Sequence, residues 1–268
     1  KIRQVLEEAG GADIEIIAKI ENREGVANID EILKVLADEY DTSIRDDKSL
    51  IALANKARKG TATYADSDKF AVKIGEKVTN AFNKAITSAD LPDGVITREV
   101  AQAVIPKLTD VSEKSVGAYA RMVQDATNKR GNVGLKALSH VHNQSRVDGI
   151  VEYASDRVYE DIKDKLGQTF VNYSQSISTG TLQENVKAQD ALGLEPIVER
   201  IYDGVGLHGG KTPCEWCIAR EGTWRYGDAI ANGVFQRHDG CGCTITYEVG
   251  NTKQIQTEWK HNVWEDIS

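Results

Sequence analysis

The sequence predicts a mainly α-helical protein, with an elongated helical body followed by a small α+β module at the C-terminal end. Three observations lead to this prediction. From residue 34 to residue 192 the apolar pattern is helical, and only Pro92 and Pro106 interrupt it. After Gly193 the residue pattern changes to short runs of β-branched and aromatic residues. All four cysteines of the 268-residue chain fall between positions 214 and 243.

The overall composition is that of an acidic globular protein. Hydrophobic residues make up 40% of the chain, which is enough to fill a core, and the formal net charge is -8. Because phosphate binding needs a cationic surface, this charge argues against a protein that coats nucleic acid. The chain has no run of about 18 apolar residues and no charged-then-apolar leader. We therefore expect a soluble, unsecreted protein with no membrane partner.

Two segments of the body have helix signals with marked ends. In the first, apolar residues advance by three or four positions and the helix closes before the turn at residues 91–94. The stripe consists of Ala71, Ile74, Val78, Phe82 and Ile86. In the second, Asp110 and Glu113 form a capping pair that predicts a helix beginning at residue 110. This helix should end at Gly131 and Asn132.

A third apolar pattern predicts one long helix. It runs from Val151 to Ile177, which is about seven turns at 3.6 residues per turn. A helix of this length suggests an elongated or bundled body. His140 and His142 precede it, and two residues that are two apart on a helix point to different faces, which argues against a shared metal ion.

The C-terminal module is predicted to extend over residues 193–268, after a helical body over residues 34–192. Ile197 to Tyr202 and Thr244 to Val249 have the character of strands, and a glycine-rich loop and the cysteines lie between them. We therefore place the boundary near Gly193.

The cysteines predict a metal site. Cys214 and Cys217 form a C-x-x-C pair, and an H-x-x-C-x-C run follows at residues 238–243. A C-x-x-C on a turn supplies two thiolates and a second short pair supplies two more, which gives the closed tetrahedral geometry of structural zinc. In a chain with ample apolar residues, this clustering favours a metal ion in a reducing compartment over a disulfide framework.

Four cysteines fill a tetrahedral zinc site, so we expect a structural ion with no position for a substrate. The predicted ligands are Cys214, Cys217, Cys241 and Cys243, with His238 as the substitute for one of them. Free thiols and a redox dithiol are the alternatives. A thioredoxin-type dithiol is disfavoured because its motif should open a helix after a strand, whereas this one follows a glycine-rich loop and Pro213.

The same residues carry a family resemblance. The C-x-x-C, Gly222, the aromatic patch from Trp224 to Tyr226 and the H-x-x-C-x-C run together resemble the C-terminal motif of MuF-type phage head morphogenesis proteins. That family has a proline and a basic residue where this chain has Asp239 and Gly242, a difference that affects a nucleic-acid contact more than metal binding. The resemblance implies a helical region before the motif. It also implies a place inside the phage head near the portal, with a role in assembly or DNA handling.

Residues 1–33 resemble a different family. The runs I-I-A-K-I-E-N and G-V-A-N-I-D-E-I-L are similar to a segment of pyruvate kinase. The resemblance implies roles in phosphoryl transfer and metal binding for Lys19 and Glu21. A (β/α)₈ barrel takes about 250 residues and builds its site from several strand ends, so one βα unit cannot form that pocket. We therefore expect residues 1–33 to be an appended segment in which Lys19 and Glu21 have no function.

These features together predict a structural minor head, or minor capsid, protein of a tailed bacteriophage rather than an enzyme. We expect it in the virion, in the head interior or near the portal, and in the host cytoplasm during assembly. The expected partners are portal and capsid proteins, with weak contact to packaged DNA. The alternatives are a phage-encoded effector or toxin enzyme and a zinc-stabilised nucleic-acid-binding module. The short stretch after Cys243 disfavours the first, and the acidic charge disfavours the second.

Overall fold

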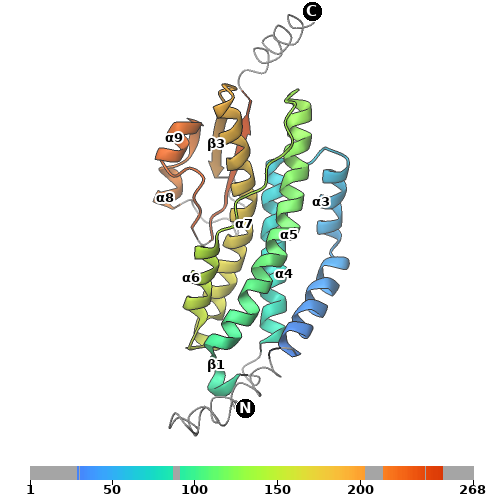
Figure 1. The fold of residues 1–268 in the computed structure, drawn as a ribbon, viewed down its shortest axis with the longest axis vertical. Coiled ribbons are helices and arrows are strands. Elements are labelled where there is room, and N and C mark those ends of the chain that lie inside the picture. Colours follow the sequence, from blue (N-terminus) through green and yellow to red (C-terminus); the bar gives the residue numbers. More distant parts are fainter. Residues whose placement is uncertain (1–28, 30, 87–90, 203–213, 239, 250–268) are drawn as a thin grey trace, which may run out of the picture.

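Three long helices form the body of the protein in a computed structural model, which describes residues 29, 31–86, 91–202, 214–238 and 240–249. They are α4 (Tyr64–Ala85), α5 (Arg98–Arg130) and α7 (Tyr159–Ala191). All three pack against one another along the long axis of the molecule (Figure 1). A helix over residues 31–45, α3 (Lys48–Arg58) and α6 (Gln144–Ala154) complete the bundle. The prediction of a mainly helical, elongated body is confirmed.

Helix α4 matches the predicted apolar stripe. Thr63 and Asp66 form a capping box at its beginning, and the stripe residues are buried. Ile86 is the C-cap. The predicted turn follows as a short 3₁₀ helix, η2 (Pro92–Gly94), with Asp93 and Gly94 in left-handed backbone conformations.

The predicted beginning of α5 at residue 110 is wrong. The helix begins at Arg98 because the Thr97 side chain accepts a hydrogen bond from the Val100 backbone N–H and caps it. Pro106 lies inside the helix rather than ending it. Asp110 and Glu113 therefore lie in the helix interior. The predicted end is correct, since Gly131 is the C-cap and Asn132 has a positive φ.

The predicted continuous helix from residue 151 to residue 177 is also wrong, because it is broken at residues 155–158. There, Asp156 adopts a φ of 58° and its N–H donates to the carbonyl of Ile96. This contact extends the antiparallel pairing of β1 (Val95–Ile96) with β2 (Arg157–Val158). The apolar spacing continues across the break because α6 and α7 both contribute apolar residues to the same core cluster.

The segment at residues 133–143, here called the strap, is extended rather than helical. It connects the end of α5 to the beginning of α6 and crosses α7 (Figure 1). The Asn185 side chain of α7 both accepts from the Leu138 N–H and donates to the Leu138 carbonyl, each over 2.9 Å. The prediction that His140 and His142 lie on a helix is therefore wrong.

The C-terminal region forms a three-stranded antiparallel sheet with the order β4-β3-β5. Its strands are β3 (Ile197–Tyr202), β4 (Gly222–Arg225) and β5 (Cys243–Glu248), joined by the short helices α8 (Glu215–Ile218) and α9 (Tyr226–Ala231). Both predicted strands are confirmed, as is the small α+β character of this region.

The sheet packs directly on the helical body. One apolar cluster contains Leu182 and Val186 of α7 together with Val198, Ile245 and Tyr247 of the sheet. The main cluster lies lower in the bundle, among the helices. None of the helices described here is long and apolar enough to cross a membrane. Residues 1–28, 30, 203–213 and 250–268 lie outside the described residues, and the predicted βα pattern of residues 1–33 falls almost entirely among them.

Candidate metal centre

The C-x-x-C pair lies on a single helical turn. Cys214 is the N-cap of α8 and accepts a hydrogen bond from the Ile218 N–H through its carbonyl, so Cys214 and Cys217 lie on the same side of that turn. The motif therefore opens a short helix of four residues. All four cysteines are free thiols.

The H-x-x-C-x-C run forms a tight turn that leads into β5. The Cys241 N–H donates to the His238 carbonyl over 3.1 Å, and Gly240 has a φ of 74°, which favours glycine. Cys243 is the first residue of β5 and pairs with Tyr202 of β3. The turn therefore aims the second cysteine pair towards α8.

The structure brings all five predicted residues together around Cys217. The ligand atoms of Cys214, Cys217 and His238 lie within 4.8 Å of one another, and so do those of Cys217, Cys241 and Cys243. The Nε2 atom of His238 is 3.4 Å from the Cys214 sulfur and 3.0 Å from the Cys217 sulfur. The cluster can hold a metal ion, because thiolates and an imidazole are the usual ligands of zinc in proteins.

Three of the cysteines are buried and the fourth is exposed. Cys217, Cys241 and Cys243 are each 2% exposed or less, whereas Cys214 lies at the surface beside His238. Since a tetrahedral ion takes four ligands, the three buried sulfurs leave one position. Cys214 and His238 are the two candidates for it.

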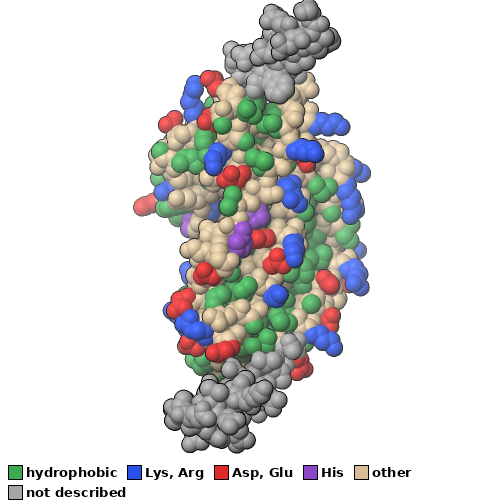
Figure 2. Space-filling model, in the orientation of Figure 1, with side chains coloured by type: hydrophobic (Ala, Val, Ile, Leu, Met, Phe, Trp, Pro, Cys, Tyr) green, Lys and Arg blue, Asp and Glu red, His purple; other side chains and the backbone are tan. Residues whose placement is uncertain are grey.

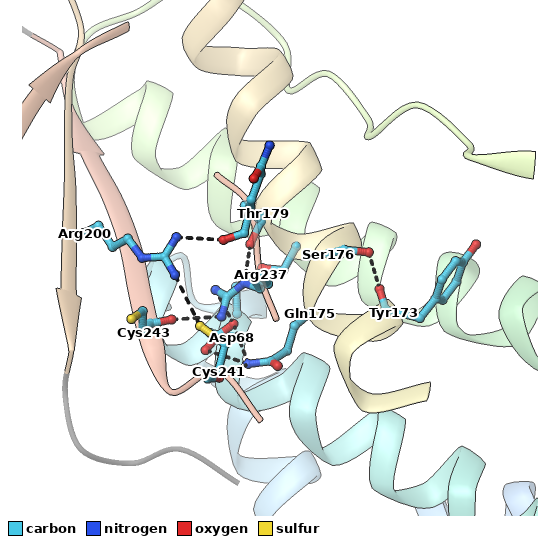
Figure 3. A network of polar contacts seen from close by, with 12 residues as sticks. Asp68, Tyr173, Gln175, Ser176, Thr179, Arg200, Arg237, Cys241 and Cys243 are labelled. Carbon is cyan, nitrogen blue, oxygen red and sulfur yellow. Dashed lines mark hydrogen bonds and ion pairs between the residues drawn. The ribbon is translucent and has the colours of Figure 1, made fainter. Parts of the chain in front are cut away.

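A buried cation lies beside the thiols. The Arg200 side chain is fully buried, and one guanidinium nitrogen is 3.3 Å from the Cys241 sulfur while the other donates to the carbonyls of Val234 and Gln236 (Figure 3). No carboxylate in the described part of the chain forms an ion pair with Arg200. Because an unpaired buried charge is costly, negative thiolates are the fitting partner. This arrangement supports a thiolate cluster of the kind that binds a metal ion.

The thiol pKa values reflect this environment. A hydrogen bond from Cys243, aided by Arg237 and Arg200, lowers the pKa of Cys241 to about 4. The same hydrogen bond raises the pKa of Cys243, and burial raises the pKa of Cys217 to about 11. The two arginines thus favour negative charge on the Cys241 sulfur. Metal binding to such thiols releases their protons.

A second arginine fastens the cysteine turn to the body. The Arg237 side chain pairs with Asp68 of α4 and donates to Thr179 of α7 and to the Cys243 carbonyl. Gln175 of α7 donates to the Asp68 carboxylate and to the Cys241 carbonyl, over 3.3–3.4 Å (Figure 3). The turn is thus held by both neighbouring helices.

The aromatic side chain within the C-x-x-C covers the cluster. The Trp216 ring lies edge-on to the His238 ring, with 5.3 Å between the centroids. The ring also makes cation–π contacts with two arginines. The Arg200 guanidinium lies 5.1 Å and that of Arg220 3.9 Å from the ring centroid. Trp216 therefore fixes both Arg200 and the His238 imidazole beside the sulfurs.

Sequence reasoning missed Arg200, Arg237 and Asp68. The signal for Arg200 was present, because β3 alternates and Arg200 occupies the same inward face as Val198. Nothing in the sequence pairs Arg237 with Asp68, because 168 residues lie between them in the chain. They meet only in the tertiary structure. Lys19, Glu21 and the glycine-rich loop before Pro213 lie outside the described residues.

Comparison with known proteins gives a match at the N-terminal end. Residues 1–40 match the family described as pyruvate kinase, barrel domain. Pyruvate kinase from Bacillus licheniformis is 27% identical over 190 residues, which are 68% of this chain and 30% of that protein's length. No solved structure matches the chain.

The described fold differs from a pyruvate kinase barrel. A (β/α)₈ barrel is built of parallel strands, whereas every strand pair among residues 31–249 that the structure describes is antiparallel. The family match covers residues 1–40, of which residues 1–28 and 30 lie outside the described part. The similarity therefore assigns no function to the metal centre.

Proposed function

We propose that this protein is a structural minor head protein of a tailed bacteriophage, acting in head assembly near the portal. The supporting observation is the convergence of the C-x-x-C and the H-x-x-C-x-C on one cluster, in the order typical of MuF-type head morphogenesis proteins. The long helical body that precedes the cluster agrees with the same resemblance. In the virion the protein would lie in the head interior or beside the portal, and in the host cytoplasm during assembly.

The metal ion of this proposal is Zn²⁺ in a structural role. Three buried sulfurs and either Cys214 or His238 fill the four positions of a tetrahedral ion, which leaves no open position for a substrate. Arg200 offsets the negative charge of the thiolates. Zinc would hold α8 against the beginning of β5, two segments that the sheet alone does not connect directly.

The helical body supplies the proposed docking surface for portal or capsid protein. Helices α5 and α7 each have 33 residues, or about 50 Å at 1.5 Å per residue. Their buried faces form the core, and their outer faces leave a long lateral surface for a partner. With a formal charge of -8 over the chain, contact with packaged DNA would be weak and strongly salt-dependent.

The zinc part of the proposal is tested by metal analysis of the purified, reduced protein. We expect zinc bound to the cysteine centre, and loss of that zinc in Cys241→Ser. Cys214→Ser and His238→Ala then identify the fourth ligand, because only the true ligand should lower the affinity sharply. Folded, reduced protein that binds no metal would refute this part.

The assembly part is tested by co-purification with portal and capsid subunits at moderate salt. The association should survive nuclease treatment and should not require DNA. A protein that binds duplex DNA tightly at physiological salt and has no affinity for any head subunit would contradict the proposal.

A further inference from the structure

A second group of metal-binding side chains surrounds Glu113, midway along the helical body. The His142 Nδ1 atom is 2.6 Å from one carboxylate oxygen of Glu113, and the His140 Nε2 atom is 3.8 Å from the other. Histidine side chains lie together near the middle of the face drawn in Figure 2. This group shares no residue with the cysteine centre.

The extended strap explains why both histidines reach the same carboxylate. Alternate residues of an extended chain point to the same side, so His140 and His142 both face α5. Gly117 of α5 and Gly180 of α7 permit the close approach, because an added Cβ would lie 3.4 Å and 3.2 Å from atoms of His140. The backbone thus brings the two imidazoles to the carboxylate from one direction.

We propose that Glu113, His140 and His142 form a second site for a divalent transition-metal ion such as zinc. Two histidines and one glutamate are a common zinc ligand set, with a fourth position left for water. At metal–ligand distances near 2.1 Å, neighbouring ligand atoms of a tetrahedral ion lie about 3.4 Å apart. The observed separations of 2.6 Å and 3.8 Å from the carboxylate lie on either side of that value.

Binding requires a small rearrangement of the imidazoles, in which the His142 Nδ1 atom moves away from the Glu113 carboxylate and the His140 Nε2 atom moves closer to it. In the described structure, the cysteine centre alone has groups of three ligand atoms that all lie within 4.8 Å of one another. The His142 side chain is 48% exposed and can turn. A cavity of about 190 Å³, lined in part by Glu113, His140 and Tyr173, provides the space.

The surroundings already orient the proposed ligands. The His142 Nε2 atom is 3.0 Å from the Gln144 amide oxygen, so that nitrogen can donate its proton while Nδ1 faces Glu113. The Tyr173 hydroxyl donates to the Glu113 carboxylate from α7.

The charges around the site do not exclude a cation. Arg121 and Arg146 are the nearby basic side chains, and their guanidinium groups donate to Ser139 and Asn172. A bound ion would fix the strap to α5 more firmly than the present ion pair does.

The test is the number of zinc ions retained by folded protein after gel filtration. The wild type should retain two per chain, His142→Ala one, and the control Glu152→Ala, at an exposed residue of α6 outside both ligand groups, two. Cobalt substitution separates the two centres, because only the cysteine centre gives thiolate-to-cobalt charge-transfer bands. These bands should persist in His142→Ala and disappear in Cys241→Ser. Failure of the cysteine centre can therefore be distinguished from failure of the Glu113 site.

A second readout tests the strap itself. Zinc should slow hydrogen exchange at the Ala137 and Leu138 amides in the wild type and in Glu152→Ala, but not in Glu113→Gln, which preserves the shape of the side chain. One zinc per chain in the wild type, held by the cysteines, would overturn the proposal. So would a second zinc that persists in the His140→Ala/His142→Ala variant.

Discussion

Arg237 and Asp68 form a buried ion pair, with 2.8 Å between a guanidinium nitrogen and a carboxylate oxygen. Their side chains are 3% and 14% exposed. Because Arg237 precedes the cysteine turn and Asp68 lies on α4, the pair connects the metal centre to the helical body. The centre is therefore part of the body's tertiary structure rather than an independent appendage.

Asp68→Ala should lower the free energy of unfolding by about 3–5 kcal/mol, because it leaves Arg237 as an unpaired buried charge. Urea unfolding followed by circular dichroism measures the change. The matched control is Asp110→Ala, which removes an exposed ion pair with Lys114 and should cost less than about 1 kcal/mol. Equal effects of the two substitutions would contradict the role given to the Arg237–Asp68 pair.

Arg200→Met should weaken zinc binding about 10–100-fold, the usual effect of removing a group that supports a metal ligand. The methionine keeps most of the buried volume but removes the cation beside the Cys241 sulfur. Competition with a chelator measures the affinity. Arg225→Met is the control, since Arg225 is exposed on β4 and should leave the affinity unchanged. An unchanged affinity in Arg200→Met would show that the thiolates do not need this charge.

The apolar spacing predicted the existence of the long helices but not their limits. The spacing indicates which residues are buried, and α6 and α7, on either side of the break at Asp156, bury apolar residues in the same core cluster. The break itself depends on β1, which is some 60 residues earlier in the chain and meets β2 only in the folded protein. The true N-cap of α5, Thr97, has the chemistry of a cap, as Asp110 does, and only the structure distinguishes them.

The metal centre was predictable to a greater extent than its surroundings. Cysteine spacing alone identified Cys214, Cys217, Cys241 and Cys243 as neighbours, because short loops hold each pair together. The long-range contacts of Arg237 and Glu113 have no local pattern. Because the strap was predicted to be helical, His140 and His142 were expected to point to different faces. On an extended chain, residues two apart point to the same side.

Asp47 should make stability depend on pH in the acidic range. Its carboxylate caps α3, and hydrogen bonds from Ser49 and then Lys77 lower its pKa. A lowered pKa in the folded state stabilises the protein above the unfolded value of about 3.9, and this stabilisation is lost as the pH falls further. Asp47→Asn keeps a capping side chain without the charge. Near neutral pH, the free energy of unfolding of the wild type should therefore exceed that of the variant by at most about 1 kcal/mol. Below about pH 4 the difference in unfolding free energy should shrink; a difference independent of pH would contradict this.

Gly75 and Gly149 offer a matched pair that tests the packing of α4 against α7. A Cβ at Gly75 would lie 2.5 Å from the Val171 Cα atom, which belongs to the backbone of α7 and cannot rotate away. A Cβ at Gly149 of α6 would meet nothing within 4 Å. The two glycines are both helical, so the intrinsic gain from alanine is the same at each site.

Gly149→Ala should therefore raise the free energy of unfolding by about 0.5–1 kcal/mol, because alanine loses less backbone freedom on folding than glycine does. Gly75→Ala should instead lower it by about 1–3 kcal/mol, because α4 and α7 must separate to admit the methyl group. Thermal and urea unfolding of both variants measure the two signs. Opposite changes in the free energy of unfolding are expected only if α4 and α7 pack closely at Gly75. Stabilisation by both substitutions would show that α4 lies farther from α7 than in the structure.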